Sequence, residues 1–267
     1  MMEIRFNLFP GGCKKALTMS YDDGTQHDIR LASIFNENGI KGTFHLNSAR
    51  FQWEGFLTED DVRTALKGHE VSCHSVHHPF LEKLPLPVAV QEVYEDRCAL
   101  ERLCGYPVRG MSYPFGTHSA QLATALRGVG MEYSRTTAST GWFGIPEDFM
   151  AWHPTCHHNE NVLDKLDRFL GQEQWNDLPL LYVWGHSYEF HNDGTWDKIE
   201  EFCKRAGSHA DVWYATNIEI VDYIAALKDL RLSADRTCAY NPRAMSVWVS
   251  VDGEAVELPG GKLTRLA

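Results

Sequence analysis

The hydrophobic positions of this chain alternate between short strand-like runs and longer segments whose apolar residues recur at helical spacing. A strand is predicted at residues 16–21, and Leu31, Ile34 and Phe35 follow it on one face of a predicted helix. Residues 180–184 are almost entirely apolar, which is typical of a strand buried on both faces. About seven such strand and helix units follow one another, so the sequence predicts an α/β fold with parallel strands closed as a barrel.

The pattern changes from about residue 230 onward. Two short apolar segments, residues 247–249 and 255–258, flank Asp252-Gly253, a pair that is typical of a tight β-hairpin turn. The sequence therefore predicts a main domain over residues 1–229 and a small β-hairpin appendage over residues 230–267.

Composition narrows the class of function. The chain has 267 residues and 43% hydrophobic content, enough for one large core, and its formal net charge of -11 argues against nucleic acid as a partner. Its seven cysteines are an odd number with no C-x-x-C pair, so a thiolate zinc site is not expected.

No run approaches the ~18 apolar residues of a membrane span, and the first ten residues do not resemble a secretory signal. We therefore expect a cytoplasmic protein without a membrane partner, while the oligomeric state stays open.

Polar residues suited to metal binding or acid–base chemistry follow the predicted strands. Asp22 and Asp23 come after the first strand, His74 and His78 after a third strand predicted at residues 70–73, and His186 after the late apolar strand at residues 180–184. Active sites of parallel sheets and barrels form at the carboxyl ends of strands, so we expect these side chains to meet. One carboxylate with two imidazoles is the usual ligand set of a catalytic divalent metal, and a spare carboxylate beside it is suited to act as a general base.

The histidine segment leaves one choice open. Pro79 directs the residue before it away from helical geometry, so His74 and His78 are expected on a loop rather than on one helix face. His77 lies between them, and the residues alone do not decide which two of the three bind a metal.

Three motifs in order resemble the polysaccharide deacetylases of the NodB type, carbohydrate esterase family 4. They are Ser20-Tyr21-Asp22-Asp23-Gly24, His74-Ser75-Val76-His77-His78 and Tyr113-Pro114-Phe115-Gly116, and the strand that ends at His186 resembles the fifth motif of that family. The resemblance covers about residues 14 to 225. It implies a distorted (β/α) barrel, in agreement with the pattern of strands and helices.

The resemblance also implies roles for single residues. Asp23, His74 and His78 would bind one divalent metal ion, Asp22 would be the general base and His186 the general acid. Zinc is the metal expected first, with cobalt, nickel or iron as alternatives that the same ligands accept.

Two positions depart from the family pattern. Family members commonly carry an arginine two residues before the proline of the third motif, where this chain has Ser112, so the nearby Arg109 is the candidate to pair with Asp22. In the region of the fourth motif, Trp152 is the candidate for the aromatic residue and Asp148 for the carboxylate that orients the acid histidine. The residues expected to contact substrate are Tyr113, Pro114, Phe115, Trp152 and Trp184.

These features predict a metal-dependent hydrolase that removes N- or O-linked acetyl groups from an acetylated sugar or oligosaccharide. One alternative is an allantoinase-like or cyclic-amide hydrolase on the same scaffold, whose substrate would be a small-molecule amide. The other is a catalytically silent relative that binds glycans.

Overall fold

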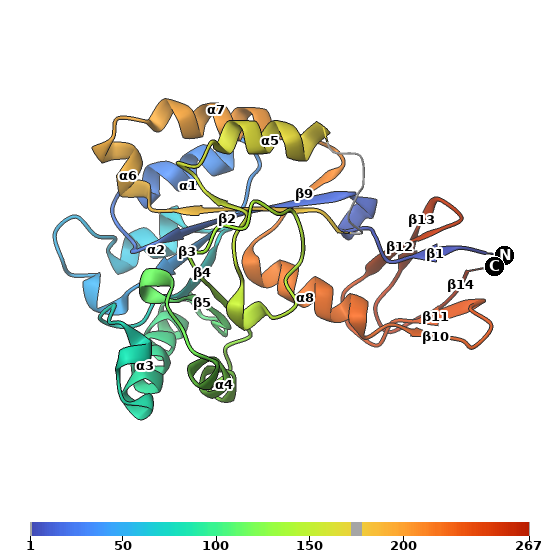
Figure 1. The fold of residues 1–267 in the computed structure, drawn as a ribbon, viewed down its shortest axis with the longest axis horizontal. Coiled ribbons are helices and arrows are strands. Elements are labelled where there is room, and N and C mark those ends of the chain that lie inside the picture. The colour runs from blue at the N-terminus through green and yellow to red at the C-terminus, as the bar shows by residue number, and fades with distance from the viewer. Residues whose placement is uncertain (1, 172–177, 267) are drawn as a thin grey trace.

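The centre of the protein is a curled sheet of parallel strands. In this computed structural model, which describes residues 2–171 and 178–266, seven strands follow one another in the order β6-β5-β4-β3-β2-β8-β7, and β9 also pairs with β2 (Figure 1). The strands are β2 (Lys15–Asp22), β3 (Gly42–Leu46), β4 (Glu70–Cys73), β5 (Gly110–Ser112), β6 (Tyr133–Arg135), β7 (Cys156–His157), β8 (Leu180–Gly185) and β9 (Val212–Tyr214). The predicted distorted barrel of about seven parallel strands is confirmed. β6 and β7 are the two end strands of this order, and in the described residues they do not pair with each other.

Helices connect the strands and cover the sheet. They are α1 (Asp28–Glu37), α2 (Glu59–Ala65), α3 (Leu86–Cys104), α4 (Ala120–Gly128), α5 (Val162–Gly171), α6 (Ser187–Asn192), α7 (Trp196–Ala206) and α8 (Asn217–Lys228), with short 3-10 turns at Pro10–Gly12, Ser48–Arg50, Leu81–Lys83, Pro114–Gly116 and Phe149–Ala151. In Figure 1, α1, α5, α6 and α7 lie on one side of the sheet, and α3 and α4 lie on the other. Within the described part of the chain, no helix combines the length and apolar character needed to cross a membrane.

Local sequence accounts for where several of these elements begin and end. Thr58 caps α2 through a reciprocal capping box with Asp61. Gly105 ends α3 in the left-handed conformation, with φ of 76°, which glycine adopts without steric cost. Every residue of β2 and of β8 is buried, which agrees with the apolar run at the late strand.

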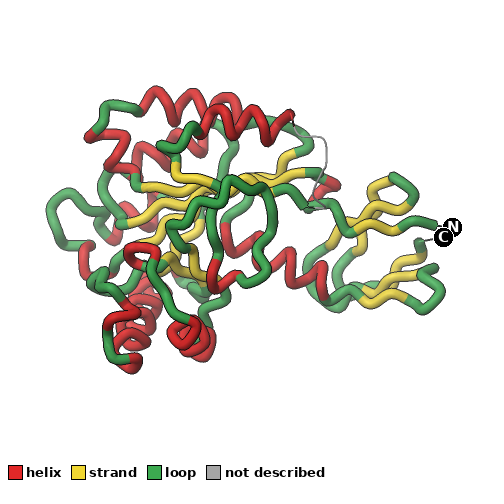
Figure 2. The backbone as a smooth tube through the Cα atoms, in the orientation of Figure 1, coloured by secondary structure: helices red, strands yellow, loops and turns green. Residues whose placement is uncertain are grey.

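The remaining strands form two small antiparallel sheets beside α8, shown in yellow at one end of the molecule in Figure 2. One contains β10 (Arg231–Leu232), β11 (Cys238–Tyr240) and β14 (Leu263–Arg265), and the other contains β1 (Ile4–Arg5), β12 (Val247–Val251) and β13 (Glu254–Leu258). The predicted hairpin is present, because β12 and β13 pair across Asp252-Gly253, whose φ angles of 49° and 90° suit a hairpin turn. The division of the chain at residue 229 stays a prediction, and the second small sheet also includes the amino-terminal strand.

The contact between β5 and β6 gives a test of how tightly the sheet is packed. A methyl group added at Gly110 would lie 1.9 Å from the ring of Tyr133, a fully buried residue whose hydroxyl donates to Glu70 Oε1 at 2.7 Å. We expect Gly110→Ala to lower the free energy of unfolding by about 1–3 kcal/mol through overpacking. Gly128→Ala is the control, because a methyl group there meets no atom within 4 Å and removes a helical glycine. Urea unfolding that finds the two variants equally stable would contradict this account.

Candidate metal and acid–base site

The residues predicted to form the site lie together at the carboxyl edge of the sheet. Asp22 is the last residue of β2, and Asp23 follows it directly. His74 follows β4, and His186 follows β8 as the N-cap residue of α6. The parallel pairing of β2 with β3 and β8, and of β3 with β4, places these strand ends side by side.

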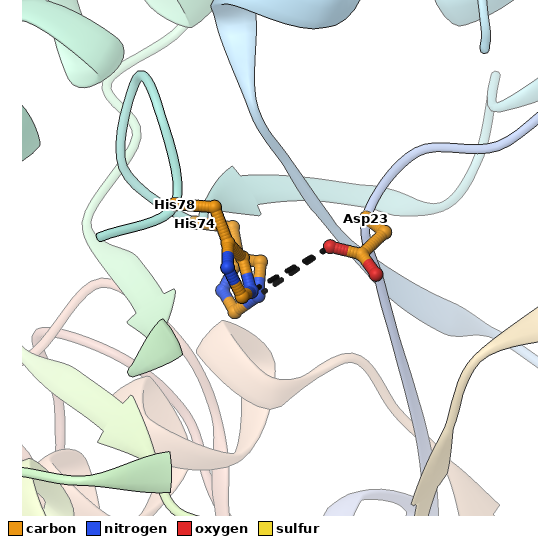
Figure 3. Close-up of side chains that lie close together, drawn as sticks. All are labelled: Asp23, His74 and His78. Carbon is orange, nitrogen blue, oxygen red and sulfur yellow. Dashed lines mark ion pairs between the residues drawn. The ribbon is translucent and has the colours of Figure 1, made fainter. Parts of the chain in front are cut away.

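Three of these side chains could hold a metal ion. Asp23, His74 and His78 place a carboxylate oxygen and two imidazole nitrogens within 4.8 Å of one another. Both rings face the Asp23 carboxylate in Figure 3, with their Nε2 atoms 3.9 Å and 3.7 Å from Oδ1. His77 lies apart from this group, with a side chain that is 66% exposed and an Nδ1 atom 2.8 Å from Glu92 Oε1.

The protonation of the two rings suits a divalent cation. His74 Nδ1 lies 2.9 Å from the carbonyl oxygen of Ser112, an atom that only accepts hydrogen bonds, so Nδ1 carries the ring proton and Nε2 offers its lone pair toward Asp23. Burial lowers the pKa of His74, and burial together with His74 lowers the pKa of His78 to about 4, so both rings are neutral at neutral pH. Neutral imidazoles with one carboxylate are the donors that zinc and similar ions prefer, so this set fits the expected metal.

The backbone around these ligands adopts the left-handed conformation at unusual positions. In the described chain, eight residues other than glycine have positive φ, and four of them belong to this region: Asp23 (80°), Ser75 (65°), His78 (60°) and Phe115 (59°). Such conformations cost of order 1–3 kcal/mol each and persist where the surroundings hold them. The Asn47 side chain donates to the carbonyl oxygens of His74 and Ser75 at 2.6 Å and 2.8 Å, which fixes the histidine loop.

Asp22 is a buried carboxylate that a buried arginine neutralises. Arg135 donates to Asp22 Oδ2, and the hydroxyl of Ser112 donates to Oδ1 at 3.0 Å. Burial alone would raise the pKa of Asp22, but the Arg135 guanidinium and the neighbouring histidines outweigh burial and hold it well below its usual range. Asp22 is therefore ionised, and its Oδ2 lies 3.8 Å from His74 Nε2.

The predicted pairing of Arg109 with Asp22 is corrected by the structure. Arg109 lies before β5 and donates to Asp222 at 2.6 Å and 2.8 Å and to Glu132 at 2.9 Å. Arg135 takes this role instead. It lies on β6, directly opposite Ser112 of β5, and Ser112 is the position where the family pattern has its arginine. Arg135 is the last residue of β6, and an arginine at the carboxyl end of a short strand was the available sequence signal.

These two arginines differ in their expected contribution to stability. Arg135→Gln should lower the free energy of unfolding by about 3–5 kcal/mol, because it leaves the fully buried Asp22 charge without its partner. Arg109→Gln should cost about 1 kcal/mol or less, since its ion pairs are partly exposed to solvent. Denaturant unfolding at neutral pH compares the two variants. Equal losses in the free energy of unfolding would show that the Arg135–Asp22 ion pair does not contribute more than the partly exposed pairs of Arg109.

His186 is held by a glutamate that the sequence analysis did not identify. Its Nδ1 lies 2.9 Å from Glu189 Oε1, and its Nε2 lies 4.0 Å from Asp23 Oδ2. Burial alone would lower the pKa of His186, but the Glu189 hydrogen bond and the nearby aspartates outweigh burial and raise it. Asp148, the predicted orienting carboxylate, pairs with Arg127 at 2.5 Å instead. A histidine followed three residues later by a glutamate at the start of a helix was the signal for this pair.

Only one of the five predicted substrate residues is substantially exposed. The Phe115 side chain is 47% exposed, stacks on Phe80 with ring centroids 3.7 Å apart and contacts the edge of His78 at 4.5 Å. Trp152 is 1% exposed and packs between Tyr133, Phe149 and Tyr182, so it is a core residue. Tyr113, Pro114 and Trp184 are also buried, with Trp184 lying under the Arg135 guanidinium at 4.5 Å.

Comparison with protein families agrees with the motifs. Residues 11–134, which carry Asp22, Asp23, His74 and His78, match the family model described as polysaccharide deacetylase. Over 116 residues the chain is 24% identical to the peptidoglycan-N-acetylmuramic acid deacetylase PdaC of Bacillus subtilis (strain 168), which covers 43% of this chain and 24% of that protein. The chain thus spans about a quarter of the length of this curated relative. The predicted relationship to the polysaccharide deacetylases is confirmed.

Solved structures share the fold at low sequence identity. A Mycobacterium smegmatis protein assigned to the polysaccharide deacetylases has a TM-score of 0.62 at 15% identity, covering 85% of this chain and 96% of that one. The Xyl-CE4 domain of a multidomain xylanase from the hindgut metagenome of Trinervitermes trinervoides has a TM-score of 0.54 at 15% identity, covering 79% and 92%. PdaC from Bacillus subtilis has a TM-score of 0.52 at 19% identity, covering 80% and 95%. The fold therefore extends well beyond the segment that the family model matches.

Proposed function

We propose that this chain, whose residues 11–134 match the polysaccharide deacetylase family model, is a metal-dependent hydrolase that removes N- or O-linked acetyl groups from an acetylated sugar or oligosaccharide. The observation that carries the proposal is the grouping of an ionised Asp22 and a Glu189-held His186 with the cluster of Asp23, His74 and His78. A net charge of -11 also suits a neutral or cationic substrate better than a polyanion.

In this proposal Asp23, His74 and His78 hold one divalent ion, with zinc expected first and cobalt, nickel or iron as alternatives. Such an ion supplies Lewis-acid chemistry, which polarises an acetyl carbonyl and lowers the pKa of water. Asp22, kept ionised by Arg135, accepts a proton from the water that attacks the acetyl carbon.

His186 completes the proposed reaction as the general acid. Glu189 holds its Nδ1–H, which leaves Nε2 to donate a proton to the departing amine or alcohol as the bond to the acetyl carbon breaks. The products are acetate and the free amino or hydroxyl group of the sugar. The backbone N–H of Phe115 is the proposed donor to the oxyanion.

The direct test measures acetate release from acetylated chitooligosaccharide and from acetylxylan, with the protein loaded with zinc or cobalt and again after chelation. We expect metal-dependent release of acetate from at least one of them. Ring opening of allantoin or a small cyclic imide without acetate release would replace the proposal with a cyclic-amide hydrolase. Tight glycan binding without turnover, unchanged by Asp22→Asn, would replace it with a silent binding protein.

The pH dependence of the reaction should report the state of His186. The acid must be protonated to act, so activity is lost as pH rises through its pKa, and the raised pKa of His186 extends activity toward alkaline pH. Glu189→Gln removes the charge that stabilises the imidazolium, so the alkaline limb of the kcat/KM profile should move to lower pH. Glu92→Gln is the matched control, because Glu92 pairs with the exposed His77 and should leave the limb in place. An alkaline limb that stays in place in Glu189→Gln would exclude His186 as the acid.

A further inference from the structure

A second cluster of metal-ligating side chains lies on the far side of His186 from Asp23. His157 is the last residue of β7, His158 follows it, and Glu189 lies in α6. Their ligand atoms all lie within 4.8 Å of one another, as those of Asp23, His74 and His78 do. The proposed function gives His157 and His158 no role.

The two oxygens of Glu189 face different partners. Oε1 accepts from His186, whereas Oε2 lies 3.1 Å from His157 Nε2 and 2.8 Å from His158 Nε2. Two imidazole nitrogens thus converge on one carboxylate oxygen, the nitrogen and oxygen donors that zinc and similar ions take in proteins.

His158 is poorly accounted for by hydrogen bonding alone. It is 1% exposed, and although its Nε2 lies close to Glu189, neither of its ring nitrogens forms an aligned hydrogen bond within the described structure. Buried polar nitrogens are rarely left in this state without a ligand or water. Movement of the ring is restricted, since a methyl group added at Gly185 would lie 2.0 Å from His158 Nδ1.

We infer that His157, His158 and Glu189 form a second divalent-cation site, which shares Glu189 with His186. This site should be weaker than the first. His157 Nδ1 accepts the Asn159 N–H at 3.2 Å, so without an ion the ring proton sits on Nε2 and has to move before Nε2 can bind a metal. Asn159 is exposed, so water can satisfy its N–H after that change.

The second site has a consequence for activity, which rests on the proposed function. A cation on Oε2 engages the same carboxylate whose Oε1 holds His186 Nδ1, and so disturbs the orientation of the His186 ring. Metal added beyond one equivalent should therefore inhibit hydrolysis.

Equilibrium dialysis against zinc, with bound metal measured by elemental analysis, tests the site without reference to activity. We expect the wild-type protein to bind two ions at saturating zinc and His157→Gln to bind one. His77→Gln, a change at an exposed histidine, should still bind two, and Asp23→Ala should keep the ion of the second site. His157 is preferred to the buried His158 for this test because its side chain is 15% exposed, and circular dichroism checks that each variant is folded.

Saturation of the wild-type protein at one ion, or two ions retained by folded His157→Gln, would overturn the second site. Inhibition by excess zinc that is relieved in His157→Gln would support its effect on His186, and equal inhibition of both proteins would overturn that effect. If no acetylated substrate is hydrolysed at all, the proposed function fails, while the stoichiometry still decides whether the second site exists.

Discussion

His74→Ala is expected to abolish hydrolysis and to remove the ion bound with Asp23 and His78. The carbonyl oxygen of Ser112 fixes the His74 ring so that Nε2 faces the Asp23 carboxylate. The alanine variant has no nitrogen at this position to bind the metal. Loss of a partner that merely orients a ligand commonly costs 10–100-fold in metal affinity, and loss of the ligand itself should exceed about 100-fold. Metal content after dialysis and acetate release are the two measurements.

Two further variants make this result specific. His78→Ala should lose the same ion and the same activity. Because His78 is less buried than His74, this variant tests the metal site even if His74→Ala fails to fold. His77→Ala should retain both the ion and the activity, because His77 points to solvent beside Glu92. Undiminished metal affinity and activity in a folded His74→Ala protein would exclude this histidine as a ligand.

Asp22→Asn is expected to lower kcat by about 10²–10⁴ while the protein keeps its metal. The amide preserves the shape of the carboxylate but no longer accepts a proton from water. The change also leaves Arg135 buried without its counter-charge, so we expect a loss of about 3–5 kcal/mol in the free energy of unfolding.

The assay of Asp22→Asn must therefore be run where the variant is folded, with metal content measured on the same sample. Asp148→Asn is the matched control, since Asp148 pairs with Arg127 at the surface and its loss should leave turnover unchanged. A folded, metal-bound Asp22→Asn protein with wild-type kcat would exclude Asp22 as the general base.

Much of the fold and the central cluster could be predicted because their signals are local in the sequence. Apolar runs mark the strands, and the residue that follows a parallel strand must lie at the carboxyl edge of the sheet. Asp23 and His74 could be placed together on this ground before their contact was known. His78 lies outside right-handed helical geometry, as expected before Pro79, but its φ of 60° is left-handed and not the extended conformation that a following proline favours.

The residues that were missed depend on geometry that local patterns do not contain. Arg135 reaches Asp22 because of the register of β5 against β6, and a shift of one residue would turn its side chain to the other face. Trp152 could be either a core residue or a sugar platform until the packing of Tyr133 and Tyr182 around it was known. The pairing of Ile4 with Val251 joins opposite parts of the chain, so no window of the sequence reveals it.

This last pairing constrains how the protein can be cut or recombined. The first strand lies against β12, and the hydroxyl of Tyr223 in α8 donates to the carbonyl oxygen of Leu8 at 2.7 Å and accepts the backbone N–H of Trp248 at 3.0 Å. A truncation after α8 would remove β12, the strand that pairs with β1, and would expose the face of α8 that carries Tyr223 to solvent. A gene fusion or domain exchange that transplants the hydrolase scaffold should therefore carry the coding sequence of both chain ends together.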